Sequence, residues 1–325
     1  MIHSLYRVLL AVILCVSFAA PVVGQSFPSK AVRVVAPYPA GGPVDLLARA
    51  LTRELSTVWG HQALVENVSG GDTSIGASRV ATAAPDGHTL LLTTSTTVVG
   101  NRFLFKKLPY DPDKNLIPIT MLGRSGSLVI VHPSLPAKSL RELVTLARGA
   151  PGRVAYGSLG RASVAHLMFG TISKREGVSF NHVPYKGSTP ALTAIVSGEV
   201  STFVVSPAGS GAMVRAGKLR AIAITSPNRT KLFPEVPSVV ESGFPYVTSW
   251  IWYGLFAPGG ASAQLVERIH RDTTAILKRP EFVARYLTES SLDAVANTPG
   301  EFAEAIRADV ASFGEMVKVA DVQPE

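Results

Sequence analysis

The sequence predicts an α/β protein of two lobes, each with a mixed, mostly parallel sheet flanked by helices. Runs of β-branched residues alternate with amphipathic helical stretches along the chain, which is the pattern of strand–helix units. The chain has 325 residues, and about 300 would remain after removal of a leader, enough for two lobes of roughly 150 residues. No internal repeat or low-complexity segment interrupts the alternation.

Residues 1–24 have the features of a secretory signal peptide. Arg7 supplies the charge, VLLAVILCVSFAA supplies the apolar core, and residues 22–24 supply a small-residue cleavage site. An N-terminal anchor helix is the alternative, although the apolar run is short for a membrane span and no stop-transfer flank follows it. Cys15 is the only cysteine, so its loss with the leader would leave no thiol for a disulfide, a metal or a nucleophile. We therefore expect a periplasmic protein.

The formal net charge of +8 favours anionic solutes or surfaces, and loss of the leader would lower it by one. The longest basic runs are pairs such as Lys106-Lys107, without interleaved aromatic residues, so no nucleic-acid partner is predicted. No later apolar stretch approaches the length of about 18 residues that a membrane helix needs.

The segment AVRVVAPYPAGGPVDLLARAL, residues 31–51, reads as a strand, a turn and a helix. Pro43 suits the first helical position, and Asp45 suits the first turn, where a carboxylate complements the helix dipole. Such a helix start directs unpaired N–H groups into the crevice at the strand end, and Gly41-Gly42 would let an oxygen approach the backbone. The pattern predicts an anion site, with a tight turn that binds nothing as the alternative.

Two later segments repeat this arrangement. In RVAYGSLGRASVAHLMF, residues 153–169, a short strand runs into a glycine–serine turn, and Ser163 is the predicted N-cap of the next helix. In NHVPYKGSTPALTAIVSG, residues 181–198, we predict Thr189 as the cap and Pro190 as the first helical residue. Each segment is a further candidate anion site.

The remaining elements complete the two lobes. Predicted strands cover residues 62–68, 88–96, 116–123, 127–133, 199–207, 218–226 and 252–260. Capping boxes are predicted at Ser139 with Glu142 and at Thr298 with Glu301. The hydroxyls of residues 93–97 come where a strand should reach the crevice, but β-propensity alone explains most of them. The predicted domains are a leader (1–24), a first lobe (25–128 and 250–325) and a second lobe (129–249).

No motif for catalysis, metal binding or a cofactor is present. The sequence has no G-x-S-x-G elbow, no H-E-x-x-H pair, no Walker A lysine and no G-x-G-x-x-G fingerprint. A serine, a histidine and an acid could still meet in space, and Ser158 with His166 would be the candidates. We expect no catalytic residue, no metal ligand and no cofactor.

An ordered set of segments carries a family resemblance. The segments are PYPAGGPVDLLARAL, APDGHTLLLTTS, LPYDPDKNLIPI, HPSLPAKSLRELVTLAR, AYGSLGRASVAHL, HVPYKGSTPAL, GKLRAIAITS, PEVPSVVESGFP and WYGLFAPGG. They resemble, in this order, the signature segments of the Bug receptors, the extracytoplasmic solute receptors of tripartite tricarboxylate transporters. The resemblance covers nearly the whole mature chain. It implies a two-lobed, periplasmic-binding-protein-like fold of type II that closes on a small carboxylated solute, and it implies the transporter's membrane permease as partner.

The resemblance also implies site residues. In that family the carboxylate is held by backbone N–H groups, ordered water and hydroxyls from loops of both lobes. The implied first-lobe contacts are Tyr38, Ala40, Gly41, Gly42 and Asp45. The implied second-lobe contacts are Ser158, Gly160, Arg161, Ser163 and His166, with Tyr185, Lys186 and Gly187 nearby.

Several of these positions keep an alternative interpretation. His166 could be a packed core histidine, and Lys186 could be a solvated loop lysine. Ala40 and Ala162 stand where the family commonly has proline and glycine, and the second change would narrow backbone access. Asp72 adds a negative charge to a loop that usually has none. If it faces the crevice it would disfavour a second carboxylate or accept an amino group; otherwise it is a solvated loop residue.

Three functions are compatible with these observations. The first is a periplasmic receptor without catalysis. The second is a secreted hydrolase on a similar α/β scaffold, which needs a serine activated by a histidine. The third is a binding protein that signals to a membrane kinase. The ligand stays open, because backbone N–H groups recognise a carboxylate and not the rest of the molecule.

Overall fold

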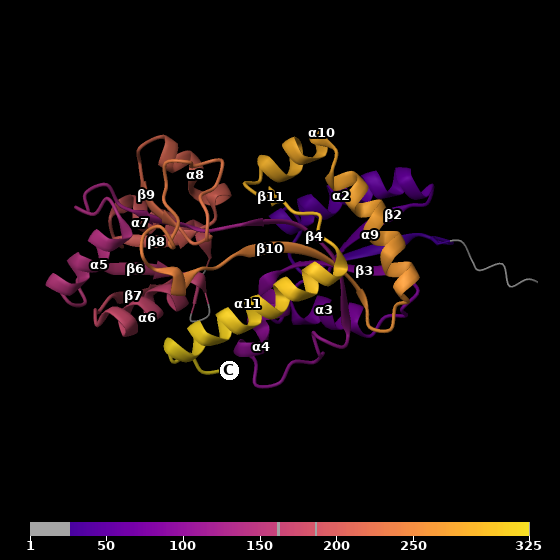
Figure 1. Ribbon diagram of the computed structural model, residues 1–325, viewed down its shortest axis with the longest axis horizontal. Coiled ribbons are helices and arrows are strands. Elements are labelled where there is room, and N and C mark those ends of the chain that lie inside the picture. The colour runs from indigo at the N-terminus through magenta and orange to yellow at the C-terminus, as the bar shows by residue number, and fades with distance from the viewer. Residues whose placement is uncertain (1–26, 161–162, 186, 325) are drawn as a thin grey trace, which may run out of the picture.

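The computed structural model describes residues 27–324 except 161, 162 and 186, so the predicted leader lies outside the described residues. Two mixed sheets, each flanked by helices, form two lobes that lie side by side (Figure 1). The predicted two-lobed α/β fold is confirmed. None of the helices within the described part of the chain is long and apolar enough to cross a membrane.

The first lobe is built on a six-stranded sheet in the order β11-β4-β10-β3-β1-β2. Its strands are β1 (Val32–Ala36), β2 (Ala63–Asn67), β3 (Thr89–Thr94), β4 (Leu116–Ser125), β10 (Ile251–Pro258) and β11 (Asp293–Ala294). Helices α2 (Pro43–Trp59) and α9 (Ala263–Leu277) cover one face, and α3 (Ser74–Ala81) and α11 (Pro299–Val319) cover the other. Short helical turns complete the lobe: η1 (Thr96–Gly100), α4 (Asn101–Leu104), α10 (Pro280–Phe282) and η3 (Val283–Thr288).

The second lobe is built on a five-stranded sheet in the order β7-β6-β8-β5-β9. Its strands are β5 (Leu128–Val131), β6 (Ala155–Ser158), β7 (Asn181–Pro184), β8 (Thr202–Val205) and β9 (Arg220–Ile224). Helices α5 (Leu140–Gly149) and α6 (Val164–Glu176), with η2 (Pro245–Val247), pack on one face. Helices α7 (Ser188–Ser197) and α8 (Pro207–Arg215) pack on the other face.

The chain passes between the two sheets twice by way of strands. β4 ends at Ser125 in the first sheet and β5 begins at Leu128 in the second, whereas β9 ends at Ile224 and β10 begins at Ile251 back in the first. β5 and β10, the first strands after each passage, run antiparallel to both of their neighbours. The strands β1–β3 and β6–β8 pair in parallel, which places their carboxyl ends at one edge of each sheet.

Helix α11 is a third connection between the lobes. Its first half packs on the first sheet through Phe302 and Ile306. Its last turns pack on the second lobe, where Met316 and Val317 contact Leu167 of α6. Figure 1 shows this helix, in yellow, crossing from one lobe to the other.

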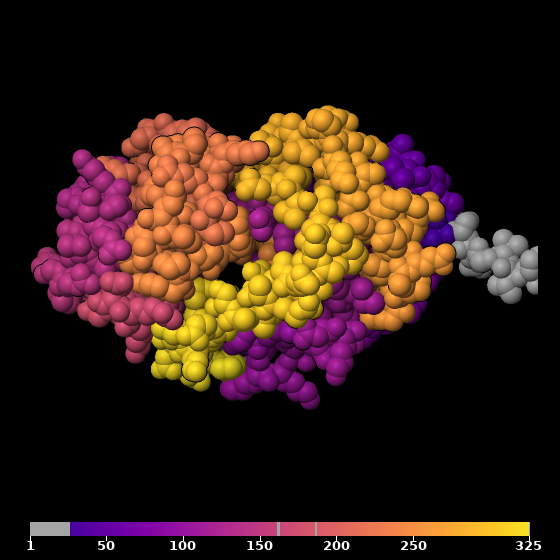
Figure 2. All heavy atoms as spheres, in the orientation of Figure 1, coloured from indigo at the N-terminus to yellow at the C-terminus, as the bar shows by residue number. Residues whose placement is uncertain are grey.

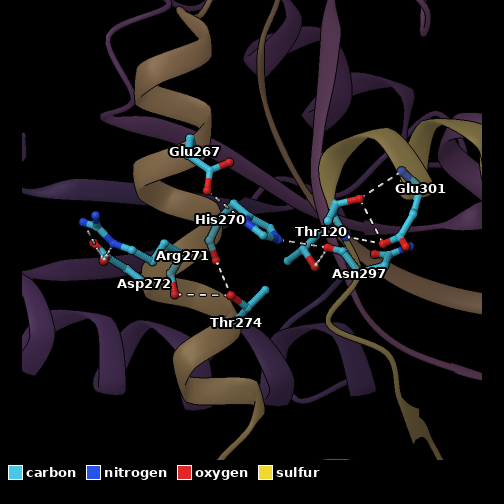
Figure 3. A network of polar contacts seen from close by, with 9 residues as sticks. Thr120, Glu267, His270, Arg271, Asp272, Thr274, Asn297 and Glu301 are labelled. Carbon is cyan, nitrogen blue, oxygen red and sulfur yellow. Dashed lines mark hydrogen bonds and ion pairs between the residues drawn. The ribbon is translucent and has the colours of Figure 1, made fainter.

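A polar network fastens the start of α11 to the first lobe (Figure 3). Thr120 of β4 donates a 2.8 Å hydrogen bond to the carbonyl of Asn297, and His270 Nε2 of α9 lies 3.1 Å from the same oxygen. The hydroxyl of Thr298 accepts from the N–H of Glu301, and the Glu301 carboxylate accepts from the N–H of Thr298. This reciprocal pair confirms one of the two predicted capping boxes. At the start of α5 only half of the other forms: Ser139 accepts from the N–H of Glu142, but the Glu142 carboxylate accepts from the N–H of Lys138.

Several predicted boundaries differ from the observed ones, and two of these differences concern the cleft. The strand expected over 88–96 ends at Thr94, because the chain turns into the π-helix η1. Helix α7 begins at Ser188, so Thr189 is not its cap and Pro190 is not its first residue. Gly187 occupies the N-cap position with φ +114°, a conformation that a residue with a side chain rarely adopts.

Candidate functional site

A cleft of about 760 Å³ lies between the lobes, and residues of both lobes and of α11 line it. A second hollow of about 570 Å³, lined by residues 38–44, adjoins it on the first lobe. The two share Thr96 and Ile251 as lining residues, so the hollow borders the cleft. Figure 2 shows the molecule hollowed between the lobes beside α11.

The turn between β1 and α2 forms the first-lobe side of this site. Gly41 adopts φ +83°, and its N–H donates a 2.9 Å hydrogen bond to Oδ2 of Asp45. Arg49 Nε donates to the same oxygen at 2.9 Å, and Asn67 Nδ2 donates to Oδ1 at 3.0 Å. Asp45 therefore holds the turn closed with both of its oxygens, and its side chain is buried.

Electrostatics keep Asp45 ionised. Burial raises its pKa, but the hydrogen bonds from Arg49, from the N–H of Gly41 and from Asn67 outweigh burial, so the pKa of Asp45 lies below its usual range. Because the positive charge of Arg49 offsets the carboxylate, the start of α2 is left available to a further anion.

Helix α2 begins without a side-chain cap. Within the described residues, no protein group accepts a hydrogen bond from the N–H of Gly42, Val44 or Asp45. These are the orphan donors of a helix N-terminus, and Gly42 and Val44 line the hollow. A Cβ on Gly42 would meet only the carbonyl of Pro39, at 3.6 Å. The arrangement is a helix N-terminus open to an anionic group.

Hydrogen bonds between hydroxyl groups hold the turn between β1 and α2 against the neighbouring segments. The hydroxyl oxygen of Tyr38 lies 2.8 Å from Thr94 Oγ1 at the end of β3. Thr73 Oγ1 lies 2.7 Å from Thr97 Oγ1 in η1. Tyr110 donates a 2.8 Å hydrogen bond to the carbonyl of Thr97. The threonines of residues 93–97, most of which β-propensity seemed to explain, thus join the Tyr38 turn to the loop before α3 and to η1.

The turn between β6 and α6 forms the second-lobe side. Ser163 is the N-cap of α6, as predicted: its hydroxyl donates to the carbonyl of Gly160 at 2.7 Å and accepts from the N–H of His166 at 3.4 Å. Gly160, with φ +111°, and Ser163 both line the cleft. Helix α7, whose N-cap is Gly187, also begins at the second-lobe side of the cleft, where Ser188 is a lining residue.

Ser158 and His166 do not form the pair that a hydrolase would need. The hydroxyl of Ser158 is fully buried, bonds His182 Nε2 and accepts from the N–H of Gly160 at 3.1 Å. His166 Nδ1 lies 2.9 Å from the hydroxyl of Tyr156, and burial raises the pKa of Tyr156 to about 12. Tyr156 also stacks on His182, so these side chains form a packed aromatic and polar layer behind the turn.

The structure divides the expected site residues into groups. Tyr38, Ala40, Gly41 and Gly42 line the first-lobe hollow, and Gly160 and Ser163 line the cleft opposite. Asp45 and Ser158 are buried behind the turns. The hydroxyl of Tyr185 donates to Glu199, and neither Tyr185 nor Gly187 is among the described lining residues. Arg161 and Lys186 lie outside the described residues.

Sequence reasoning missed part of the lining. Ile251 and Tyr253 enter it from β10, and Asp309, Phe313 and Met316 enter it from α11. The helical periodicity of α11 placed Phe313 on an apolar face, but it could not tell that this face turns from the core toward a cleft. Asp72, by contrast, does line the cleft.

Within the part of the chain that the structure describes, no three histidine, aspartate or glutamate side chains come together in a group that could hold a metal ion.

Comparisons with known proteins identify related sequences and structures. Residues 47–322 match the model of the tripartite tricarboxylate transporter family receptor. Protein BugT of Bordetella pertussis is 30% identical over 301 residues, which cover 92% of this chain and 92% of BugT. The solved structure of R. palustris Rpa4515 with adipate superposes with a TM-score of 0.79 at 28% identity, covering 92% of this chain and 100% of that one.

A second solved structure is MatC from Rhodopseudomonas palustris with bound malate. It has a TM-score of 0.73 and 29% identity, and the match covers 90% of this chain and 100% of MatC. The family match spans well over half of the sequence, and the solved neighbours share the two-lobed fold across nearly their full length. The chain therefore belongs to the family of tripartite tricarboxylate transporter receptors.

Proposed function

We propose that this protein is a periplasmic receptor that captures a small carboxylate between its lobes and delivers it to the membrane subunits of a tripartite tricarboxylate transporter. The unpaired N–H groups of Gly42 and Val44 carry the proposal, because both residues line the hollow beside the cleft and their N–H groups have no protein acceptor among the described residues. The adipate and malate in the two solved neighbours support a carboxylate as the ligand class.

In the proposed mechanism the carboxylate binds at the start of α2. The N–H groups and the positive end of the helix dipole stabilise the anion without a cationic side chain. Tyr38 offers a hydroxyl beside them, and Gly160 and Ser163 approach from the second lobe when the lobes close. Closure replaces water by fixed dipoles, which strengthens each hydrogen bond to the ligand.

The expected site residues then have two roles. Tyr38, Ala40, Gly42, Gly160 and Ser163 contact the ligand. Gly41, Asp45, Ser158 and His166 position the turns, since their described hydrogen bonds go to other protein groups.

Export and domain division belong to the same proposal. Residues 1–24 act as the leader that directs the chain to the periplasm. Residues 25–128 and 250–325 form one lobe and residues 129–249 the other; the membership of the two sheets supports this division, except that Leu128 belongs to β5 of the second sheet. The end of α11 is then a segment of the first lobe that reaches across to the second.

The test uses Gly42→Val with Gly300→Val as its matched control. Both glycines flank a proline at a helix start, and an added Cβ meets no close obstacle at either position, so both variants should fold. Calorimetry with malate, adipate, hexanoate and benzoate identifies a ligand for the wild type. We expect Gly42→Val to weaken it at least about tenfold, or ~1.4 kcal/mol, and Gly300→Val to leave it unchanged.

Two outcomes would contradict the proposal. Equal affinities for Gly42→Val and the wild type would remove the start of α2 from the site. Turnover of generic esters that Ser158→Ala abolishes, with no acid binding at all, would favour the hydrolase instead.

A further inference from the structure

The cleft beyond the two turns is lined mainly by apolar side chains. Leu104 and Phe105 line it from the first lobe, Leu159 and Val164 from the second, and Phe313 and Met316 from α11. Leu159 is 45% exposed, although it sits in the turn that faces the first lobe. An apolar side chain held open at such a position gains contact area only when an apolar group enters the cleft. The lining therefore suits the body of a ligand rather than a second charged end.

The charged groups of the described lining are all negative. Asp72 and Asp309 line the cleft, and no lysine, arginine or histidine is among the described lining residues of the cleft or of the adjoining hollow. Arg124 lies close by: its guanidinium stacks on Trp250, 4.3 Å from the ring centroid, and its positive charge acts on the carboxylate of Asp309. A second carboxylate beside Asp72 would meet negative charge and apolar surface.

Both aspartates are held in place by the fold. Asp72 has φ +45°, and Asn101 Nδ2 donates a 2.7 Å hydrogen bond to its carbonyl, so the loop that carries Asp72 is fastened to the helix after η1. Asp309 Oδ2 accepts a 2.6 Å hydrogen bond from Trp252 Nε1 at the passage between the lobes. The backbone of Asp72 and the carboxylate of Asp309 are therefore held at the cleft wall, and burial raises the pKa of Asp309.

We propose that the cleft selects a monocarboxylate with an apolar body, such as an alkanoate or an aromatic acid, and rejects acids with a second carboxylate at the far end. The inference rests on the proposed function of the same site, and it names the class of acid that the site takes. The carboxylate occupies the start of α2, and the apolar body lies between Leu159 and α11. Asp72 determines this specificity by repelling a distal carboxylate.

Matched acid pairs test the selection. Hexanoate and adipate share a six-carbon chain, and benzoate and terephthalate share a ring, so each pair differs in one carboxylate only. Calorimetry on the mature wild-type chain should show the monoacid of a pair binding at least about tenfold tighter, a difference of ~1.4 kcal/mol. Equal or tighter binding of the diacid overturns the inference and leaves the proposed receptor function standing. Binding of none of these acids, nor of malate, contradicts the receptor function itself.

Asp72→Asn tests the source of the selection. Asparagine tolerates the positive φ at this position, so the variant should fold. We expect the affinity for adipate to rise at least about threefold relative to that for hexanoate, because the repelling charge is gone. Glu281→Gln removes one negative charge from α10, outside the described lining, and should leave the ratio unchanged. An unchanged ratio in Asp72→Asn rejects Asp72 as the specificity residue.

Discussion

Asp45 is a buried carboxylate at the start of the helix that we propose receives another carboxylate. Asp45 and a ligand carboxylate can share one helix end because Arg49 offsets the charge of Asp45. In addition, the carboxylate oxygens of Asp45 accept hydrogen bonds from Gly41 and Asn67. The N–H groups of Gly42 and Val44 remain for the ligand. Asp45 lies in the first turn of α2, as predicted from the helix dipole, but the local sequence does not distinguish a ligand contact from a residue that shapes the turn.

Asp45→Asn should lower the free energy of unfolding by about 1–3 kcal/mol at pH 7, because a charge-assisted set of buried hydrogen bonds is weakened. The folded pKa of Asp45 lies below its unfolded value of about 3.9, so its stabilisation is full above that pH and disappears as the pH falls through the folded pKa. Urea unfolding at pH 7, 5 and 3 measures this. The difference between wild type and variant should be constant from pH 7 to 5 and smaller at pH 3. A difference that grows in acid would contradict the assignment.

The threonines of residues 93–97 make contacts that amino-acid composition and strand propensity do not predict. Strand propensity accounts for Thr93 and Thr94, but Thr97 lies in a π-helix, where its hydroxyl meets Thr73 and its carbonyl meets Tyr110. Those partners come from segments more than ten residues away, and local sequence patterns carry no information on such contacts.

Two serine N-caps in the second lobe stabilise helices, and one of them also lies at the cleft. Ser163 caps α6 beside the cleft, and Ser139 caps α5 on the outer side of the same lobe, each by accepting from the N–H three residues later. Both caps were predictable, because a serine before a helical period is a local signal. The start of α7 was not, because Gly187 takes the cap position through its backbone alone.

Ser163→Ala and Ser139→Ala should each cost about 1 kcal/mol of stability in chemical denaturation. Only Ser163→Ala should also weaken acid binding, since it releases the carbonyl of Gly160 and loosens a turn that lines the cleft. Calorimetry on both variants separates the two effects. Equal loss of affinity in the two variants would mean that the α6 turn has no special part in binding.

Helix α11 links the lobes through the contacts that its C-terminal end makes with α6. Its start is fastened to the first sheet through Asn297, and its end meets α6, where Glu315 pairs with Arg175 at 3.5 Å. A Cβ on Gly170 would lie 2.9 Å from the Cβ of Ala320, so the two helices approach as closely as glycine allows. Periodicity predicted the helix and its apolar face, but which lobe each turn contacts depends on the path of the whole chain.

Gly170→Ala should destabilise the protein by about 1–3 kcal/mol and displace the end of α11 from α6. Ala320→Gly in the same chain should restore most of that loss, because it removes the opposing methyl group. Unfolding measurements on the two single variants and the double variant give the coupling. Small-angle scattering should show a changed lobe arrangement in Gly170→Ala alone, and additive single effects would contradict the contact.

The fold class, the two helix-start turns and most strands were accessible from sequence because each depends on local periodicity and on glycine, proline and serine chemistry. The composition of the cleft was not accessible in the same way. Asp309 and Met316 become lining residues only because α11 crosses between the lobes, and no local pattern predicts that crossing.

The path of α11 also has a practical consequence for reagents. Val322 and Gln323 line the cleft, so a purification tag fused after them would begin beside the proposed ligand site and could occupy the same space. Phe27, where the described chain starts, packs on Trp59, and neither residue lines the cleft. A tag belongs before Phe27, and an environment-sensitive dye attached at Gln323 would report directly on ligand entry.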